Sequence, residues 1–191
     1  MKSFVGIDCG LDGYVVVIDD AGVGRASWPT PTLNVRKDST RREYDVAAMR
    51  EILEEIRHES EPFVVLEKQQ AMPGLGHERC SVCHRPLHQQ GVSSSFTTGR
   101  GFGLWEGLLC GLRLSYAVVH PKTWQAACLR DIPGDNTKAR AIIAAQRLFP
   151  GVDLRKTPAC KGAHDGKADA LLMSWYGWSC GNLREIAEAK V

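Results

Sequence analysis

Short apolar runs separated by turn residues open the chain and predict three consecutive strands. Ser3 to Ile7 and Tyr14 to Ile18 are two such runs, and 23–28 is a third. The segments between them are rich in Gly and Asp, which favour turns. Because the connections are short, we expect an antiparallel meander. Residues 29–42, with two prolines and several polar residues, are expected to form a loop.

Helical and strand-like patterns alternate over the rest of the chain. Apolar residues recur at helical spacing from Tyr44 to Glu59, and Phe63 to Leu66 is a compact buried strand ending at Glu67. Beyond an irregular stretch, the expected elements are a helix over about 98–112, a strand over 115–119, a short helix after Pro121, a helix from the N-cap Asn136 to Leu148, and a last helix over about 164–178. This order predicts one α/β domain over 1–180, in which helices flank a mixed five-stranded sheet whose first three strands are antiparallel, followed by a tail over 181–191.

Length and composition narrow the class of protein. The chain has 191 residues, of which 43% are hydrophobic and 24% charged, as in an ordinary globular domain. No apolar run is long enough to span a bilayer, and the N-terminus lacks the pattern of a signal peptide. The seven cysteines are an odd number and mostly isolated, which argues against a secreted disulfide framework. We therefore expect a cytoplasmic protein with no membrane partner.

Charge is unevenly distributed along the chain. Residues 85–167 hold twelve Lys or Arg against five acids, although the net charge of the whole chain is only +2. Such a distribution is typical of a protein with one surface facing a polyanion, and it also fits an ordinary solvated face.

Four acidic residues occupy positions that favour a metal site. Asp8 follows the first predicted strand and Glu67 ends the fourth, where a carboxylate is costly unless it is solvated or bound to a cation. Asp165 and Asp169 are four residues apart, so one helix face carries both. Carboxylates of this kind bind Mg²⁺ or Mn²⁺. In the alternative interpretation Asp8 caps a turn, and the other two only favour a helix N-terminus.

The same segments resemble a known family. GIDCG, VVLEK and HDGKADALL, in this order, resemble the RuvC-like Holliday junction resolvases of the RNase H-like superfamily. Residues 90–176 are most similar to phage-type and chloroplast members. The resemblance implies an RNase H-like fold in which Asp8, Glu67 and Asp169 bind metal. Many relatives have a further acid where this chain has Gly166, so Asp165 is the expected replacement and His164 the alternative.

The resemblance also implies an activity. We expect an endonuclease that binds branched DNA and resolves four-way junctions by paired nicks, as a homodimer with two Mg²⁺ or Mn²⁺ ions per active site. A non-catalytic, zinc-containing DNA-binding protein on the same fold is the first alternative. A sugar kinase of the actin-like fold, indicated by GIDCG alone, is the second, and the chain is short for the two lobes of such a kinase.

Basic, hydroxyl and aromatic residues supply candidate DNA contacts. Lys122, which matches the family, is expected beside the scissile phosphate as a catalytic residue. The candidate DNA-binding residues are Ser93, Ser94, Phe96, Arg100, Phe102, Lys138 and Arg140. Either Phe96 or Phe102 could wedge between bases at the junction, or pack in the core instead.

A Cys/His cluster predicts a zinc-binding insert over 75–89. His77, Cys80, Cys83 and His88 have the pattern H-x2-C-x2-C-x4-H, which suits tetrahedral zinc in a closed, structural site. His84 and Cys160 are alternative ligands. The other interpretation is a flexible loop with reduced cysteines.

Overall fold

A computed structural model describes residues 1–35, 41–69, 80–84 and 91–180, and it is built around a five-stranded sheet. The strands are β1 (Lys2–Ile7), β2 (Tyr14–Asp19), β3 (Gly24–Pro29), β6 (Glu61–Glu67) and β7 (Ser115–Val119). Their order across the sheet is β3-β2-β1-β6-β7. The first three are antiparallel, whereas β6 runs parallel to both β1 and β7. The mixed sheet with an antiparallel N-terminal half is confirmed.

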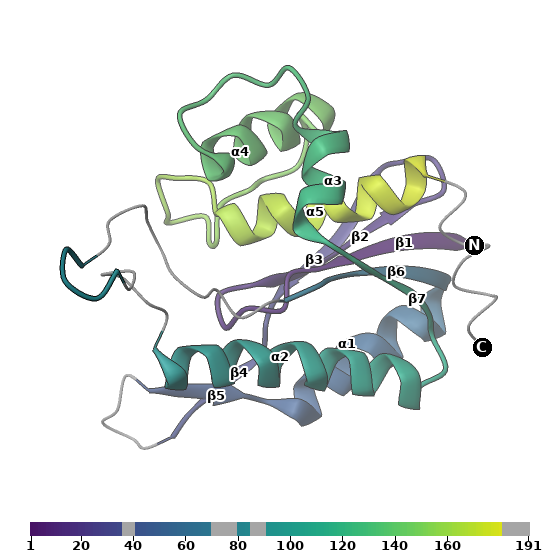
Figure 1. The fold of residues 1–191 in the computed structure, drawn as a ribbon. Helices are drawn as coiled ribbons and strands as arrows, with labels where there is room; N and C mark the ends of the chain where they lie inside the picture. The colour runs from purple at the N-terminus through teal and green to yellow at the C-terminus, as the bar shows by residue number, and fades with distance from the viewer. Residues whose placement is uncertain (36–40, 70–79, 85–90, 181–191) are drawn as a thin grey trace.

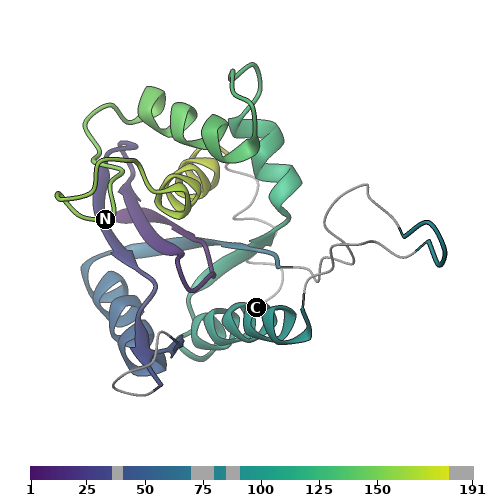
Figure 2. The same cartoon turned by 90° about the vertical axis from the view of Figure 1, so that its left-hand side faces the viewer.

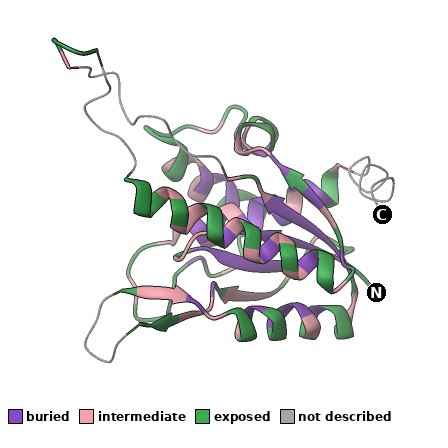
Figure 3. Cartoon of the chain, turned by 60° about the horizontal axis from the view of Figure 1, so that its bottom comes forward, coloured by how far each residue is buried: buried purple, intermediate pink, exposed green. Residues whose placement is uncertain are grey.

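Helices cover both faces of this sheet (Figures 1 and 2). On one face lie α1 (Val46–Glu59) and α2 (Val92–Gly111), and on the other α3 (Pro121–Cys128), α4 (Thr137–Leu148) and α5 (Asp165–Ser179). Alternate side chains of the strands enter two separate apolar clusters, so that Val5 and Val64 pack on the α1/α2 side and Phe4 and Phe63 on the other. Figure 3 shows the resulting buried sheet between more exposed helices.

Two expectations about local structure were wrong. The segment expected to be a loop contains a small hairpin of β4 (Thr32–Asn34) and β5 (Arg42–Tyr44), whose strands are too short to carry a periodic pattern. The helix expected from about residue 98 begins at Val92. The sequence did not indicate this earlier start, because the first turns are solvent-exposed and show no apolar repeat. Ser93 and Ser94 therefore belong to the helix rather than to a preceding loop.

The packing of α5 on β1 depends on Gly6. A Cβ atom at this position would lie 1.9 Å from the backbone oxygen of Ala170 in α5. Only glycine permits so close an approach of helix and strand. α5 is buried on most of its surface and crosses β1 and β2, which brings its N-terminal turns to the end of β1 where Asp8 lies.

The C-terminal tail expected over 181–191 lies outside the described residues. Among the helices that the structure describes, none has the length and apolar character needed to cross a membrane.

Candidate active site

Asp8 and Glu67 lie next to each other at one edge of the sheet. The last residue pair between β1 and β6 joins Ile7 to Leu66, so the residue that follows this pair along each strand is one of the two acids. Asp8 also accepts a hydrogen bond of 3.2 Å at Oδ1 from the backbone N–H of Gly10. The parallel pairing of two strands thus explains why acids 59 residues apart in sequence meet.

Asp169 of α5 is the third member of this acidic cluster. Burial, and then the charges of Asp8, Glu67 and Asp165, raise the pKa of Asp169 to about 8. Burial is also the largest cause for Asp8, whose pKa rises to about 6, and for Glu67, whose pKa rises to about 7 with a further contribution from the charge of Asp8. Burial thus raises all three pKa values, and the charge of Asp8 further raises those of Glu67 and Asp169. Buried acids of this kind are unfavourable together unless a cation joins them.

Two residues that the sequence did not point to orient Glu67. The indole Nε1 of Trp124 donates to Oε1 at 3.0 Å, and Nε2 of Gln69 donates to Oε2 at 2.9 Å. Trp124 is fully buried one turn into α3, the helix that directly follows β7, the neighbour of β6. The sequence could have indicated Trp124 as a partner of Glu67, because it is an aromatic residue one helical turn after β7, the strand beside β6.

Asp165 stands apart from the other three acids because it has a cation partner. It forms an ion pair with Lys138 at the start of α4, and this contact holds the pKa of Asp165 below its usual range. The Lys138 charge also opposes the rise in the pKa of Asp8 and Asp169. Lys138, expected as a DNA contact, thus adjoins the acids.

His164, the alternative to Asp165, accepts a 3.4 Å hydrogen bond at Nδ1 from the backbone of Lys167 and caps α5.

Gly166 packs directly against the Asp8 carboxylate. A Cβ at this position would lie 2.8 Å from Oδ2 of Asp8 and 2.8 Å from the backbone oxygen of Asp12. A side chain at position 166 would therefore point at Asp8.

The donor set of Asp8, Glu67 and Asp169 has the chemistry of a site for a hard divalent cation. Oδ1 of Asp169 is buried and has no hydrogen-bond partner among the described residues, which is the state of a carboxylate oxygen that a cation would satisfy. In their present side-chain positions, no three Asp, Glu, His or Cys residues of the described chain converge closely enough to hold an ion. Their carboxylate oxygens would have to move inward to hold one.

Lys122 and Arg140 line a cavity between α3 and α4. Lys122 lies two residues before Trp124 on α3, and it is exposed in the cavity on the α4 side. The Arg140 guanidinium donates to the backbone oxygens of Leu129 and Ile132. It holds the end of α3 in place as well as being a candidate DNA contact.

The remaining candidate DNA contacts lie on α2. Phe96 is 71% exposed, whereas Phe102 is partly buried against the α1/α2 core. Arg100 forms a 3.7 Å ion pair with Glu43 of β5. Ser93 accepts a hydrogen bond from Thr97 at its backbone oxygen. Of the two aromatic candidates, Phe96 alone has a ring free for contact with a partner molecule.

Part of the Cys/His insert is described. Cys80 and Cys83 lie on a tight turn in which the N–H of His84 donates to the backbone oxygen of Cys80 at 2.9 Å, with His84 at φ 55°. Hydrogen bonds from the backbone of Cys83 and Val82, and then from the Cys83 thiol, lower the pKa of Cys80. His77 and His88 lie outside the described residues.

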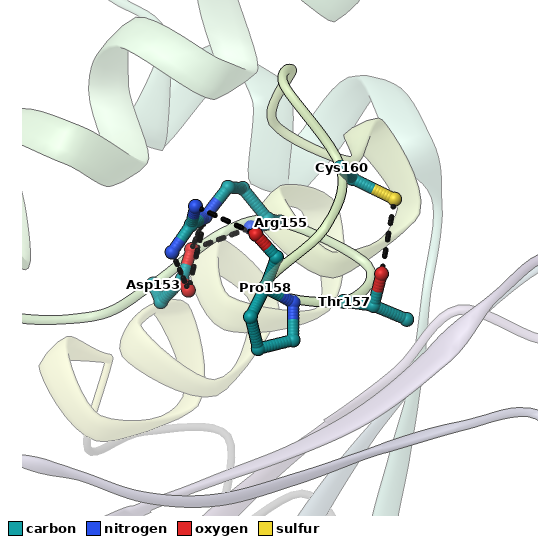
Figure 4. A network of polar contacts seen from close by, with 5 residues as sticks. All are labelled: Asp153, Arg155, Thr157, Pro158 and Cys160. Carbon is teal, nitrogen blue, oxygen red and sulfur yellow. Dashed lines mark hydrogen bonds and ion pairs between the residues drawn. The ribbon is translucent and has the colours of Figure 1, made fainter.

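Cys160, the outlying zinc candidate, lies in another part of the fold. It lies in the loop between α4 and α5, where its thiol is 3.3 Å from Oγ1 of Thr157 (Figure 4). The same loop is braced by Arg155, which donates to Asp153 and to the backbone oxygen of Pro158. Among the described residues Cys160 does not form a metal-binding group with Cys80 and Cys83.

Comparisons with known proteins identify the fold. No protein-family model matches the chain, and no curated protein matches its sequence. RuvC of T. thermophilus, solved in complex with a Holliday junction substrate, is 13% identical, with a TM-score of 0.55 over 100% of this chain and 96% of that one. A further Thermus thermophilus RuvC structure, also 13% identical, has a TM-score of 0.44 over 98% and 95% of the two chains. The first match shows that this chain has the RuvC-type, RNase H-like fold.

Proposed function

We propose that this chain is a metal-dependent endonuclease that resolves four-way DNA junctions. The observation that carries the proposal is that Asp8, directly after β1, lies at the same end of the sheet as Glu67 of β6 and Asp169 of α5, with the pKa of each raised. The fold that surrounds them is that of RuvC, which was solved on a Holliday junction substrate. Fold alone does not assign an activity, and the acids add the chemistry.

The proposed reaction is hydrolysis of a phosphodiester. The oxygen of water bonds to phosphorus while the bond to the 3′ oxygen breaks. The water gives up a proton and the leaving 3′ oxygen takes one from solvent, so the products are a 5′-phosphate and a 3′-hydroxyl. Two bound Mg²⁺ or Mn²⁺ ions would supply an activated water and charge neutralisation at the phosphate. Asp8, Glu67 and Asp169 would hold these ions, with Asp165 as a fourth ligand on release from Lys138.

The other residues of the site position these groups. Trp124 and Gln69 fix both oxygens of Glu67, and Gly10 fixes Oδ1 of Asp8. Lys138, beside the acids, would neutralise part of the charge on the scissile phosphate.

DNA would pass over α2 as well as over the acids. Phe96 is the proposed wedge, because its exposed ring can stack on or separate bases. Ser93, Ser94 and Arg100 on the same helix would contact the backbone. Symmetric paired nicks need two active sites, so we propose a homodimer.

We further propose that Cys80 and Cys83 contribute to a structural zinc site. Zinc binds thiolates, and the hydrogen bonds that lower the pKa of Cys80 favour its thiolate form. His77 and His88 would complete the site, with His84 as the alternative.

A nicking assay on a synthetic four-way junction tests the proposed function. With Mg²⁺ we expect symmetric nicks, and with EDTA none. Asp8→Asn should abolish cleavage and leave junction binding within about threefold, because it removes charge but little volume. Full activity of Asp8→Asn would overturn the mechanism. Tight binding without any metal-dependent cleavage by the native chain would favour a non-catalytic DNA-binding protein.

A further inference from the structure

A cationic cavity lies between α3 and α4, beside the buried acids but not part of them. It is open to solvent and has a volume of about 380 Å³. Three of its lining side chains are basic, namely Lys122, Arg130 and Arg140, and none of the residues that line it is acidic. The hydroxyl of Thr137 adds a neutral hydrogen-bonding group. This combination suits an anion rather than an apolar ligand.

Arg140 places a fixed positive charge at the cavity. Its guanidinium donates to the backbone oxygens of Ile132, at 3.0 Å, and of Leu129. Both acceptors are neutral, and Arg140 forms no ion pair with a described acidic residue. The side chain is therefore held in position while its charge stays uncompensated. A preorganised cation of this kind favours an incoming anion at low entropic cost.

Lys122 and Arg130 complete the basic lining from α3 and the residues that follow it. Both are exposed, and neither forms an ion pair with an acid in the part of the chain that the structure describes. Three like charges around one cavity repel one another, and a bound anion would relieve this repulsion.

Both walls of the cavity also reach the acidic cluster. On α3, Trp124 donates to Glu67, whereas Lys122, two residues earlier, lies on the cavity side of the same helix. On α4, Lys138 directly follows Thr137 of the cavity lining and forms an ion pair with Asp165. A DNA strand that lies over the acids and continues along α3 and α4 would have its neighbouring backbone beside this cavity. Backbone phosphates recur at regular intervals, so one of them would fall within reach of these cations.

We propose that the cavity is a phosphate-binding subsite for the DNA strand that the acidic cluster cuts. The inference rests on the proposed nuclease function and deepens it. The three cations hold one backbone phosphate next to the scissile one, and this contact sets which bond reaches Asp8, Glu67 and Asp169. The ligand is a phosphodiester, whose single negative charge and two free oxygens match a guanidinium and an ammonium group.

Two neighbouring alanines on α3 give a matched test. Ala126 lines the cavity, whereas Ala127 is also exposed and does not line it. Ala126→Glu places a carboxylate among the cations and should weaken junction binding in EDTA about tenfold, with a salt slope shallower by about one contact. Ala127→Glu has the same charge and helix propensity, and should stay within about twofold. Equal melting temperatures for both variants verify that the fold is intact.

A second pair removes a cation instead of adding an acid. Arg130→Ala should reproduce the effect of Ala126→Glu, and Arg147→Ala, on the exposed end of α4 outside the cavity, should not. A junction with a single neutral methylphosphonate beside the cleavage point should bind the native chain more weakly. The same modification should weaken binding by Arg130→Ala by a smaller factor, because one of the three cations is already absent.

The outcomes separate this inference from the proposed function. If the native chain binds and nicks junctions but Ala126→Glu and Ala127→Glu weaken binding equally, the subsite is wrong and the nuclease stands. The same holds if no methylphosphonate position distinguishes Arg130→Ala from the native chain. If the native chain does not bind junctions at all, both proposals fail.

Discussion

Gly166 lies so close to Asp8 that a Cβ on the glycine would come within 2.8 Å of the Asp8 carboxylate oxygen. The helix that bears Asp169 therefore contacts the strand end that bears Asp8 without an intervening side chain. The chain departs here from the family that its sequence resembles, many members of which have an acid at this position. The contact gives this departure a structural effect, because α5 can approach the Asp8 turn as closely as it does only without that side chain.

Gly166→Ala should lower the free energy of unfolding by about 1–3 kcal/mol, as expected when a methyl group is forced into a packed interior. The added atom would also meet the backbone oxygen of Asp12, which cannot rotate away. Chemical denaturation measures the loss. Gly162→Ala is the control, because a Cβ there meets nothing within 4 Å. Equal stability of the two variants would contradict the close packing.

Trp124→Phe should shift the acidic limb of the nicking pH profile upward by about one unit. The indole donates to the ionised form of Glu67, and its loss raises the pKa of this acid above about 7. The rate at pH 6.5 should fall more than the rate at pH 8.5. Trp178→Phe is the matched control, since that indole donates to the backbone of Asp20. A uniform fall in rate across pH would instead indicate a merely structural role.

The metal-free protein should lose stability as pH rises. An acid whose pKa is raised by folding keeps its proton in the folded chain at pH values where the unfolded chain has released it. Between about pH 4 and pH 8 the folded state therefore binds more protons, and the free energy of unfolding falls as pH increases. Thermal melting in EDTA across this range measures the effect.

Asp169→Asn should remove the largest part of this pH dependence. The variant should melt higher than the native chain at pH 8 and about equally at pH 4. Asp153→Asn, in which the acid has a pKa lowered to about 2 by Arg155, should not be stabilised at pH 8. Mg²⁺ should raise the melting temperature of the native chain at pH 8 and that of Asp169→Asn much less. An unchanged pH dependence in Asp169→Asn would show that its carboxyl is not held protonated.

Purified protein should contain about one zinc per chain, as a single closed Cys/His site requires. Cys80→Ser and Cys83→Ser should each lose it, because a thiolate ligand is removed. Cys110→Ser, an exposed single cysteine on α2, should retain the metal. Absence of zinc from the native chain, or retention of zinc in both ligand variants, would leave the insert without a metal.

The sequence predicted those parts of the fold that have a local signal. The five strands of the sheet and Asn136 as the N-cap of α4 follow from apolar runs and a capping residue, and the structure places them as expected. The hairpin of β4 and β5 has three-residue strands, and the first turns of α2 are exposed, so neither had a periodic pattern to detect.

The site was predictable only as far as strand ends determine it. Asp8 and Glu67 could be placed together because parallel neighbours end at the same edge. The partners of these acids depend on side-chain directions across the fold. The Trp124 indole reaches Glu67 from one side of α3, while Lys122 two residues earlier faces the cavity. The ion pair of Lys138 with Asp165 likewise depends on how α4 packs beside α5.

The glycine contact between β1 and α5 has a consequence for the order of events during folding. Asp8 and Glu67 can meet as soon as β1 and β6 pair, but Asp169 joins them only when α5 docks across Gly6. Any intermediate with α5 undocked holds two of the three acids and has no complete cation site. In the nuclease that we propose, cleavage of DNA is therefore coupled to completion of the native fold, and an incompletely folded molecule can bind DNA without cleaving it.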